Sequence, residues 1–297
     1  MLTRRHVPHA LTLAGLTLAA AAPVAHAADG LSWQAFPAGP NGFFRASVLL
    51  TGPREAILID GGFTLSDGRA VAAAIQASGK RLTTILVTQS DPDYYFGLAP
   101  IRAAFPAARI IAAPETVAAI RASVQKKLET WGPQLRENGP QSLADVVIPE
   151  ASAEALLRLD GEAVEIIPAA GLANRRHVRV PALDAVLGGV LVFAGLHVWT
   201  ADTPTAPERA AWVANLNAMA ARDPRIVVPG HMAPGAAMDA SALIFTRDYL
   251  RAFEEELAKP GDSAALIAAM RARYPTAGLG IALEIGAKVA KGEMRWG

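Results

Sequence analysis

The feature that most constrains the fold is a short apolar run that leads into a polar loop. The segment from Ile85 to Gly97 reads Ile-Leu-Val-Thr-Gln-Ser-Asp-Pro-Asp-Tyr-Tyr-Phe-Gly. The run from Thr84 to Thr88 predicts a buried strand, and the loop from Gln89 to Tyr95 opens toward a helix that begins near Leu98. Ligands usually bind at strand ends in α/β sheets, so two carboxylates and two phenols here favour a site. The alternative is a simple turn, because Asp-Pro-Asp is ordinary turn chemistry.

Composition excludes several classes of function. The chain has 297 residues, of which 52% are apolar and 19% are charged, so it can bury a substantial core. Its formal net charge is +1, which leaves no basic surplus for binding nucleic acid. Cysteine is absent, and this excludes disulfides, thiolate catalysis and cysteine metal sites.

The N-terminus has the pattern of an export signal. Arg4 and Arg5 precede an apolar run from Leu11 to Ala22 that is too short to span a bilayer. Ala25-His26-Ala27 fits a cleavage site with small residues, so we expect residues 1–27 to be removed and the mature chain to cover residues 28–297. The predicted location is periplasmic or secreted, by a twin-arginine-like or a general secretory route, with no stable membrane span after cleavage. An uncleaved anchor is the alternative.

Strand and helix patterns alternate along two similar halves of the mature chain. Ser66 is the expected cap of the first helix and Gly79 its stop. Gly and Ser are too sparse between the elements to form a linker, so residues 28–297 are expected to form a single domain. Such alternation predicts sheet packed on sheet with helices outside. Strands are expected at 48–51, 56–59, 84–88, 110–112, 163–167, 178–180, 185–193 and 225–228, and helices at 66–78, 98–105, 114–136, 205–221, 241–259, 263–274 and 280–290.

The loop after the central strand resembles the metal-binding loop of the metallo-β-lactamase superfamily, which reads His-x-His-x-Asp-His. Gln89, Asp91, Asp93 and Tyr94 stand at the four ligand positions, and only Asp93 matches. The loop is most similar to a branch that carries Ser-Asp-Pro-Asp-Tyr-Tyr-Phe-Gly, where the first ligand position is commonly still His, so Gln89 is a further departure. The resemblance covers about residues 48–234. It implies an α/β (α+β) fold, a four-layer αββα metallo-β-lactamase sandwich with extra C-terminal helices at about 241–290.

The resemblance extends to other ligand positions and shows a broad loss of ligands. Leu172 and Val190 stand where the superfamily has His and Asp, whereas His231 in Val228-Pro229-Gly230-His231 is kept. Asp60 matches an aspartate that usually has a structural role. The mature chain has only three histidines, His177, His197 and His231.

Catalytic zinc usually takes three protein ligands rich in imidazole. The resemblance therefore implies no lactamase-type dinuclear zinc site. Two alternatives remain for these residues. One is a single atypical metal ion bound by Asp93 and His231, with oxygen ligands that suit Mn, Fe or Mg. The other is a hydrogen-bond cluster without a metal.

A metal-free acid/base site is a second hypothesis for the same residues. If Asp91 and Asp93 converge, like-charge repulsion would raise the pKa of one of them. His231 could act as a general base, and Tyr94 or Tyr95 could donate a hydrogen bond to an oxyanion. β-Lactamase activity itself is not expected, because a zinc-bound hydroxide needs ligands that this chain lacks.

These residues lead to two functional hypotheses of different class. The first is an exported, hydrolase-like metallo-β-lactamase-fold protein with a degenerate metal site, acting on a small ester, amide or lactone through Asp91, Asp93, Tyr94 and His231. The alternative is a non-catalytic periplasmic pseudoenzyme that binds a ligand or partner. The expected partner is a small molecule, not nucleic acid, and the sequence makes no prediction of oligomeric state.

Two further segments have alternative interpretations. His197 and Trp199 alternate and would share one face of a strand, which fits either a pocket wall or a packed strand end, with Asp202 capping the next helix. Arg175-Arg176-His177 fits either an anion-binding segment or a solvated loop.

Overall fold

We analysed a computed structural model of the chain, which describes residues 25–26 and 30–296. The predicted export signal lies outside these residues apart from Ala25 and His26. Within the described ranges, none of the helices combines the length and the apolar character needed to cross a membrane.

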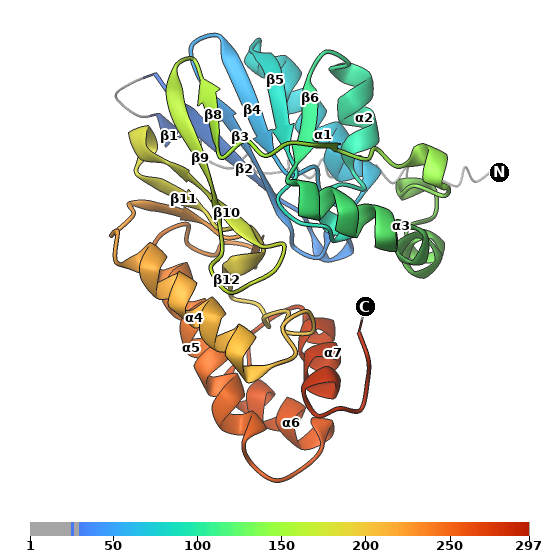
Figure 1. Cartoon of the computed structure of the whole chain (residues 1–297), viewed down its shortest axis with the longest axis vertical. Helices are drawn as coiled ribbons and strands as arrows, with labels where there is room; N and C mark the ends of the chain where they lie inside the picture. The colour runs from blue at the N-terminus through green and yellow to red at the C-terminus, as the bar shows by residue number, and fades with distance from the viewer. Residues whose placement is uncertain (1–24, 27–29, 297) are drawn as a thin grey trace, which may run out of the picture.

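The first sheet contains the strands predicted at 48–51 and 56–59 and the strand that leads to the site. Its seven strands lie in chain order, antiparallel from β1 to β4 and parallel from β4 to β7 (Figure 1). The predicted strands at 48–51, 56–59, 84–88 and 110–112 correspond to β3, β4, β5 and β6, whereas β2 was not predicted. The strands are β1 (Ala25–His26), β2 (Ser32–Pro37), β3 (Ala46–Thr51), β4 (Glu55–Ile59), β5 (Arg81–Leu86), β6 (Arg109–Ala112) and β7 (Glu150–Ala151).

The second sheet is interrupted where the sequence predicted one continuous strand. Residues 185–193 form β11 and the first residue of β12, separated by a short 3-10 turn at Gly189–Leu191. Gly189 has a φ of +54°, a conformation that turns the chain and that a strand does not use. The sheet has the order β13-β11-β10-β9-β8, and β12 (Phe193–Ala194) pairs separately with β14 (His231–Met232). Its strands are β8 (Leu156–Leu159), β9 (Glu162–Pro168), β10 (Arg176–Val180), β11 (Ala185–Leu187) and β13 (Ile226–Val228).

Helices cover the outer faces of both sheets. In Figure 1, α1 to α3 lie against the first sheet, α4 and α5 lie against the second, and α6 and α7 extend beyond the sheets. This arrangement confirms the four-layer sandwich with additional C-terminal helices. The helices are α1 (Leu65–Ser78), α2 (Leu98–Ala104), α3 (Pro114–Leu135), α4 (Ala206–Ala220), α5 (Ser241–Leu257), α6 (Ser263–Arg273) and α7 (Gly280–Ala290).

The core follows from the two-residue period of the strands. Val48 and Leu50 of β3 belong to the apolar layer between the two sheets, whereas Leu49 packs in the layer under the helices. In β4, Ile57 and Ile59 alternate with Leu58 in the same way. Both faces of these central strands are therefore buried, which explains their continuous apolar runs.

Two predicted helix caps were wrong by a few residues. Thr64, not Ser66, caps α1, because its hydroxyl accepts from the Asp67 backbone N–H while the Asp67 carboxylate accepts from the Thr64 N–H. Thr205, not Asp202, caps α4 in the same reciprocal manner with Glu208. Threonine satisfies free N–H groups at a helix start as serine or aspartate does. Asp202 is thereby free to make a different contact near the site.

Candidate functional site

The loop after β5 is both a turn and one wall of a pocket. Pro92–Tyr94 forms a 3-10 turn in which the Tyr94 N–H donates to the Asp91 carbonyl at 3.0 Å. The Tyr94 carbonyl in turn accepts from the Gly61 N–H at 2.7 Å, which ties the loop to the end of β4. Proline and aspartate favour such a turn. The turn directs Asp93 and Tyr94 inward, where both are buried.

His231 reaches the same place from the second half of the chain. β14 pairs with β12, and the His231 ring stacks on Phe193 with 4.8 Å between the ring centroids. His231 Nδ1 lies 2.9 Å from the Phe43 carbonyl oxygen. A carbonyl can only accept, so Nδ1 carries the proton and Nε2 presents a lone pair.

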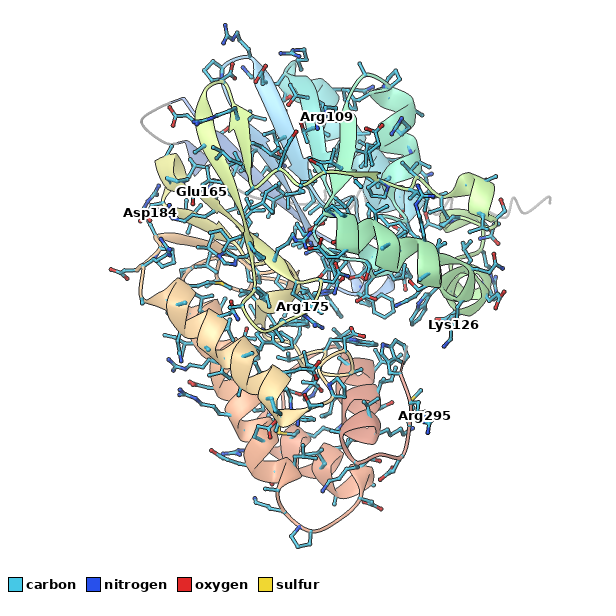
Figure 2. All side chains as sticks on the ribbon, viewed as in Figure 1. Arg109, Lys126, Glu165, Arg175, Asp184 and Arg295 are labelled. Atoms are coloured by element: carbon cyan, nitrogen blue, oxygen red, sulfur yellow. The ribbon has the colours of Figure 1, made fainter. Side chains whose placement is uncertain are left out.

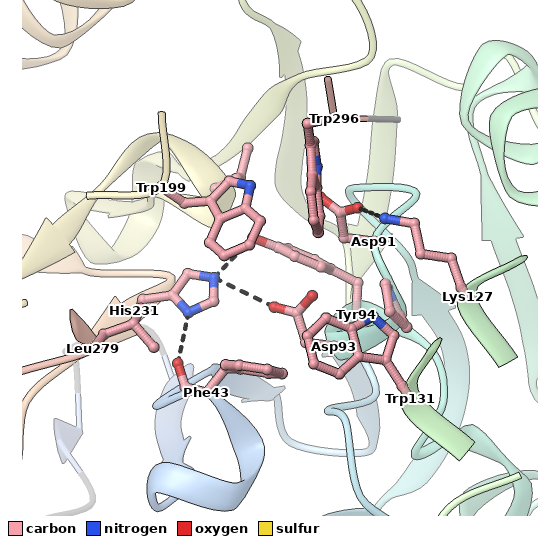
Figure 3. Close-up of a pocket in the computed structure, with 12 residues that line it drawn as sticks. Phe43, Asp91, Asp93, Tyr94, Lys127, Trp131, Trp199, His231, Leu279 and Trp296 are labelled. Carbon is pink, nitrogen blue, oxygen red and sulfur yellow. Dashed lines mark hydrogen bonds and ion pairs between the residues drawn. The ribbon is translucent and has the colours of Figure 1, made fainter. Parts of the chain in front are cut away.

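Asp93 and Tyr94 both face that lone pair. Asp93 Oδ2 and the Tyr94 hydroxyl each lie 3.4 Å from His231 Nε2, as Figure 3 shows. The structure thus brings together three of the four predicted site residues from distant parts of the chain. When the Asp93 carboxyl is ionised, the Tyr94 hydroxyl is the one hydrogen-bond donor at this point, and Asp93 and His231 Nε2 can both only accept.

Burial governs the protonation of this cluster. Burial, together with the nearby Arg45 charge, lowers the pKa of His231 to about 3, so the imidazole is neutral at ordinary pH. Burial, and secondly the charge of Asp91, raises the pKa of Asp93 to about 7. Burial also raises the pKa of Tyr94 well above its usual value, so its hydroxyl stays protonated. Asp93 is the group of the three that titrates near neutral pH.

The fourth predicted residue, Asp91, has a different partner. Its Oδ1 accepts from Lys127 Nζ at 2.6 Å, and both side chains are mostly buried. Lys127 lies on α3, four residues before Trp131, so the two side chains share one face of the helix. The sequence analysis missed Lys127, and its position on a long amphipathic helix carried no signal that it would reach the loop.

Aromatic rings form much of the wall of the cavity that contains this cluster. The cavity has a volume of about 50 Å³, and Figure 3 shows Trp199 and Trp296 on one side of it and Phe43 and Trp131 on another. Trp296 lies edge-on to Trp199, with 5.2 Å between the ring centroids. The pocket-wall interpretation of Trp199 therefore matches the structure, whereas Trp296 was not singled out from the sequence. The lining residues are Phe43, Asp91, Pro92, Asp93, Tyr94, Lys127, Trp131, Val190, Trp199, His231, Leu279 and Trp296.

A buried ion pair supports the floor of the site. Arg45 pairs with Asp60, and the Arg45 guanidinium lies 4.0 Å from the centroid of the Tyr94 ring. The Asp60 carboxylate also accepts from the backbone N–H and the hydroxyl of Thr88. This arrangement agrees with the structural role expected for Asp60 and fixes the face of Tyr94.

The remaining positions matched to metal ligands do not supply a metal site. Gln89 Oε1 accepts from Asn174 Nδ2 at 3.0 Å, and Leu172 and Val190 are buried apolar residues. Within residues 25–26 and 30–296, no group of three or more His, Asp or Glu side chains is arranged to hold a metal ion. The residues present therefore do not fit a dinuclear zinc centre, since Asp93 and His231 supply only two suitable donors and the phenol of Tyr94 keeps its proton.

The Arg175-Arg176-His177 segment is not a solvated loop. Arg175 is 4% exposed, and residues 176–177 lie in β10 and are also buried. Arg175 Nη2 lies 3.8 Å from Asp202 Oδ2, and that carboxylate accepts from Trp199 Nε1 at 2.9 Å. Burial, followed by the charge of Asp91, raises the pKa of Asp202 to about 6. The segment thus supports the Trp199 wall of the pocket from behind.

Comparison with known proteins agrees with this architecture. A family model described as the metallo-beta-lactamase superfamily matches residues 40–231. Among curated proteins, none matches the chain. Among solved structures, a β-lactamase domain protein from Burkholderia ambifaria has a TM-score of 0.64 at 17% identity and covers 93% of this chain and 88% of its own.

Two shorter structures are also similar. A metallo-β-lactamase from Pontibacter korlensis has a TM-score of 0.55 at 17% identity, covering 77% of this chain and 98% of its own. One from Erythrobacter litoralis has a TM-score of 0.52 at 17% identity, covering 77% and 95%. At such identities the likeness concerns the fold. Because only 7% of this chain lies outside the Burkholderia match, that match includes part of the C-terminal helices.

Proposed function

The chain belongs to the metallo-β-lactamase superfamily, and from this premise we propose that it is an exported hydrolase of a small ester, amide or lactone that works without a zinc pair. The observation that carries the proposal is the approach of Asp93 Oδ2 to His231 Nε2, at 3.4 Å, on the wall of a pocket. A carboxylate with a pKa of about 7 suits a general base at neutral pH.

Each member of the cluster has a separate proposed role. Asp93 removes a proton from a water molecule that attacks the substrate carbonyl carbon. The Tyr94 hydroxyl donates a hydrogen bond to the oxyanion that forms. His231, fixed by its Nδ1–H bond to the Phe43 carbonyl, accepts a hydrogen bond through Nε2 and orients the attacking water.

A non-catalytic ligand-binding protein is the second candidate. The observation that favours it is the cavity itself, which has about 50 Å³ and is walled mainly by aromatic and aliphatic side chains. Pockets with apolar walls and few polar groups are also typical of binding sites. Asp93, Tyr94 and His231 would then orient a bound ligand without catalysing its reaction.

An ester and lactone screen on the mature chain separates the two candidates. We expect Asp93→Asn to lose turnover by a factor of about 100 or more, the usual contribution of a general base. Asp248→Asn, on an exposed position of α5, is the matched control and should retain wild-type turnover. Unchanged turnover in Asp93→Asn would contradict the proposed mechanism, and saturable binding without turnover would favour the binding protein.

Export is part of the proposal and has its own measurement. The basic start, the apolar run from Leu11 to Ala22 and the Ala25-His26-Ala27 site support it. Mass spectrometry of protein from the periplasmic fraction should give a chain that begins at Ala28. An intact N-terminus in the cytoplasmic fraction alone would contradict it.

A further inference from the structure

The ion pair between Lys127 and Asp91 lies at a position where the related metal-binding loop has a metal ligand. Asp91 stands where the metal-binding loop that this chain resembles has a histidine ligand, and here its Oδ1 accepts from Lys127 Nζ at 2.6 Å. The side chains of Lys127 and Asp91 are only 18% and 19% exposed. A mostly buried ammonium group therefore lies on the wall of the pocket, as Figure 3 shows.

The chain brings several of its own positive charges to this region. Arg45 neutralises Asp60 under the Tyr94 ring, and Arg175 lies 3.8 Å from Asp202 behind Trp199. Both of these cations are set behind the pocket, and neither is among its lining residues. Of the described basic side chains, Lys127 is the one that lines the cavity together with Asp93, Tyr94 and His231.

Lys127 retains its charge and has hydrogen-bonding capacity to spare. Burial acts to lower its pKa, but the carboxylates of Asp91, Asp202 and Asp93 together outweigh burial, and the pKa is raised above its ordinary value. An ammonium group has three donors. One donates to Asp91, and the Trp296 ring lies 5.8 Å from Nζ. Because Lys127 also lines the cavity, one of its remaining donors can serve a bound ligand.

We propose that the Lys127 ammonium group, held by Asp91, takes the place of the metal cation as the oxyanion-binding charge of this pocket. The catalytic part of this inference rests on the proposed hydrolysis, and the binding part does not. In the reaction, a water oxygen bonds to the carbonyl carbon while Asp93 takes the water proton. The π electron pair moves to the carbonyl oxygen, which accepts hydrogen bonds from Lys127 and Tyr94. When the carbon–oxygen bond to the leaving group breaks, the proton on Asp93 passes to the departing alkoxide, giving a carboxylic acid and an alcohol.

The proposal names the class of ligand that should bind even without turnover. An oxyanion beside an aromatic ring matches one ammonium donor and walls of Phe43, Trp131, Trp199 and Trp296. Benzoate is the simplest probe of this class, and benzamide is its neutral counterpart of nearly the same shape. Three of the five tryptophans of the chain line the pocket, so intrinsic fluorescence can report binding of both probes.

The experiment compares the mature wild type with Lys127→Met and with Lys127→Cys before and after treatment with 2-bromoethylamine. Because the chain has no cysteine, the introduced thiol is the sole target, and aminoethylation restores an ammonium group at nearly the reach of lysine. We expect Lys127→Met to weaken benzoate binding about tenfold or more, the scale of one charge-assisted hydrogen bond, with benzamide binding nearly unchanged. Aminoethylation should recover most of the benzoate affinity, which a variant damaged only in folding would not show.

Several outcomes would overturn the proposal. The first is that the wild type does not bind benzoate, and the second is that the wild type and Lys127→Met bind it with equal affinity. The third is that the aminoethylated protein is folded but does not recover benzoate binding. The fourth is that the wild type loses benzoate binding after dialysis against a chelator. The last outcome would assign the charge to a bound metal ion.

The same variants distinguish this inference from the proposed function. Benzoate binding that depends on Lys127, in a protein that hydrolyses nothing, would support the oxyanion site and contradict hydrolysis. Hydrolysis that depends on Asp93 and is unchanged in Lys127→Met would support the function and contradict the role of Lys127.

Discussion

At the scale of single residues, the site is built around one carboxyl group that burial keeps close to neutrality. Asp93 faces the lone pair of His231 Nε2, so its protonated form can donate to the imidazole and its ionised form meets a second acceptor. Burial acts in the same direction and raises the pKa of Asp93 to about 7. Asp93, the proposed general base, therefore also destabilises the folded protein when its carboxyl group is ionised.

The raised pKa of Asp93 predicts that the free energy of unfolding falls as the pH rises. The folded-state pKa of Asp93 lies above the usual value of 3.8, so the folded protein binds the extra proton and loses stability as the pH rises from about 4 to about 7. Asparagine cannot ionise. Asp93→Asn should therefore match the wild type at about pH 4 and exceed it by a few kcal/mol at about pH 8, since a tenfold change in an equilibrium is worth about 1.4 kcal/mol.

Urea unfolding of both proteins at the two pH values measures this difference. Asp248→Asn serves again as the control and should show no such pH dependence. A loss of stability in Asp93→Asn at high pH would mean that the carboxylate is stabilised by a bound cation in the folded protein.

The site residues differ in how far the sequence could identify them. Asp93, Tyr94 and His231 came from a motif, and the structure brings their side chains together. The sequence suggested that the charge of Asp91 would raise the pKa of Asp93, and it does so as the second cause after burial. The hydrogen-bond partner of Asp91 is nevertheless Lys127, 36 residues further along the chain. A contact of this kind depends on how α3 lies across the loop, and spacing along the chain contains no information about it.

At the scale of elements, most strands and helices followed from apolar runs and helical periodicity. The exceptions have local causes. β8 is short and alternates between exposed and buried residues, and the predicted strand at 185–193 breaks because two glycines at 188–189 begin a turn. That turn matters for the site, because Gly189 packs directly against Gly230, the residue before His231.

Gly230→Ala tests this close approach. A Cβ atom at position 230 would lie 1.8 Å from the Gly189 carbonyl oxygen, so the backbone that carries His231 must shift. We expect a loss of about 1–3 kcal/mol in unfolding free energy, as for overpacked cores, together with weaker ligand binding. Gly39→Ala is the control, because its Cβ would meet nothing within 4 Å. Equal stability of the two variants by thermal unfolding would show that the contact is easily relaxed.

At the scale of the whole molecule, the C-terminal segment contributes one wall of the pocket. The Glu293 carboxylate accepts from the backbone N–H and the hydroxyl of Ser263 at 2.7 and 2.6 Å, which anchors the segment after α7. Beyond that anchor, Trp296 reaches the cavity and lies against Trp199. The resemblance to a known fold covered only about residues 48–234, so it did not predict a wall residue from this end.

Trp296→Ala should open the cavity. Trp296 lines the cavity and lies against Trp199, so the loss of its ring widens the space between the cavity walls. We expect acrylamide to quench the remaining tryptophan fluorescence more strongly in Trp296→Ala and benzoate to bind faster in stopped flow. Met294→Ala, which alters an exposed side chain of the same segment, should behave as wild type. Unchanged quenching in Trp296→Ala would show that ligands enter by another route.

The position of Trp296 also has a consequence for how the protein should be produced. A purification tag fused after Gly297 would be separated by a single residue from Trp296, whose side chain lines the cavity. Such a tag would compete with Trp296 for the entrance or hold it aside. A substrate screen on that fusion would report on the tag as much as on the protein.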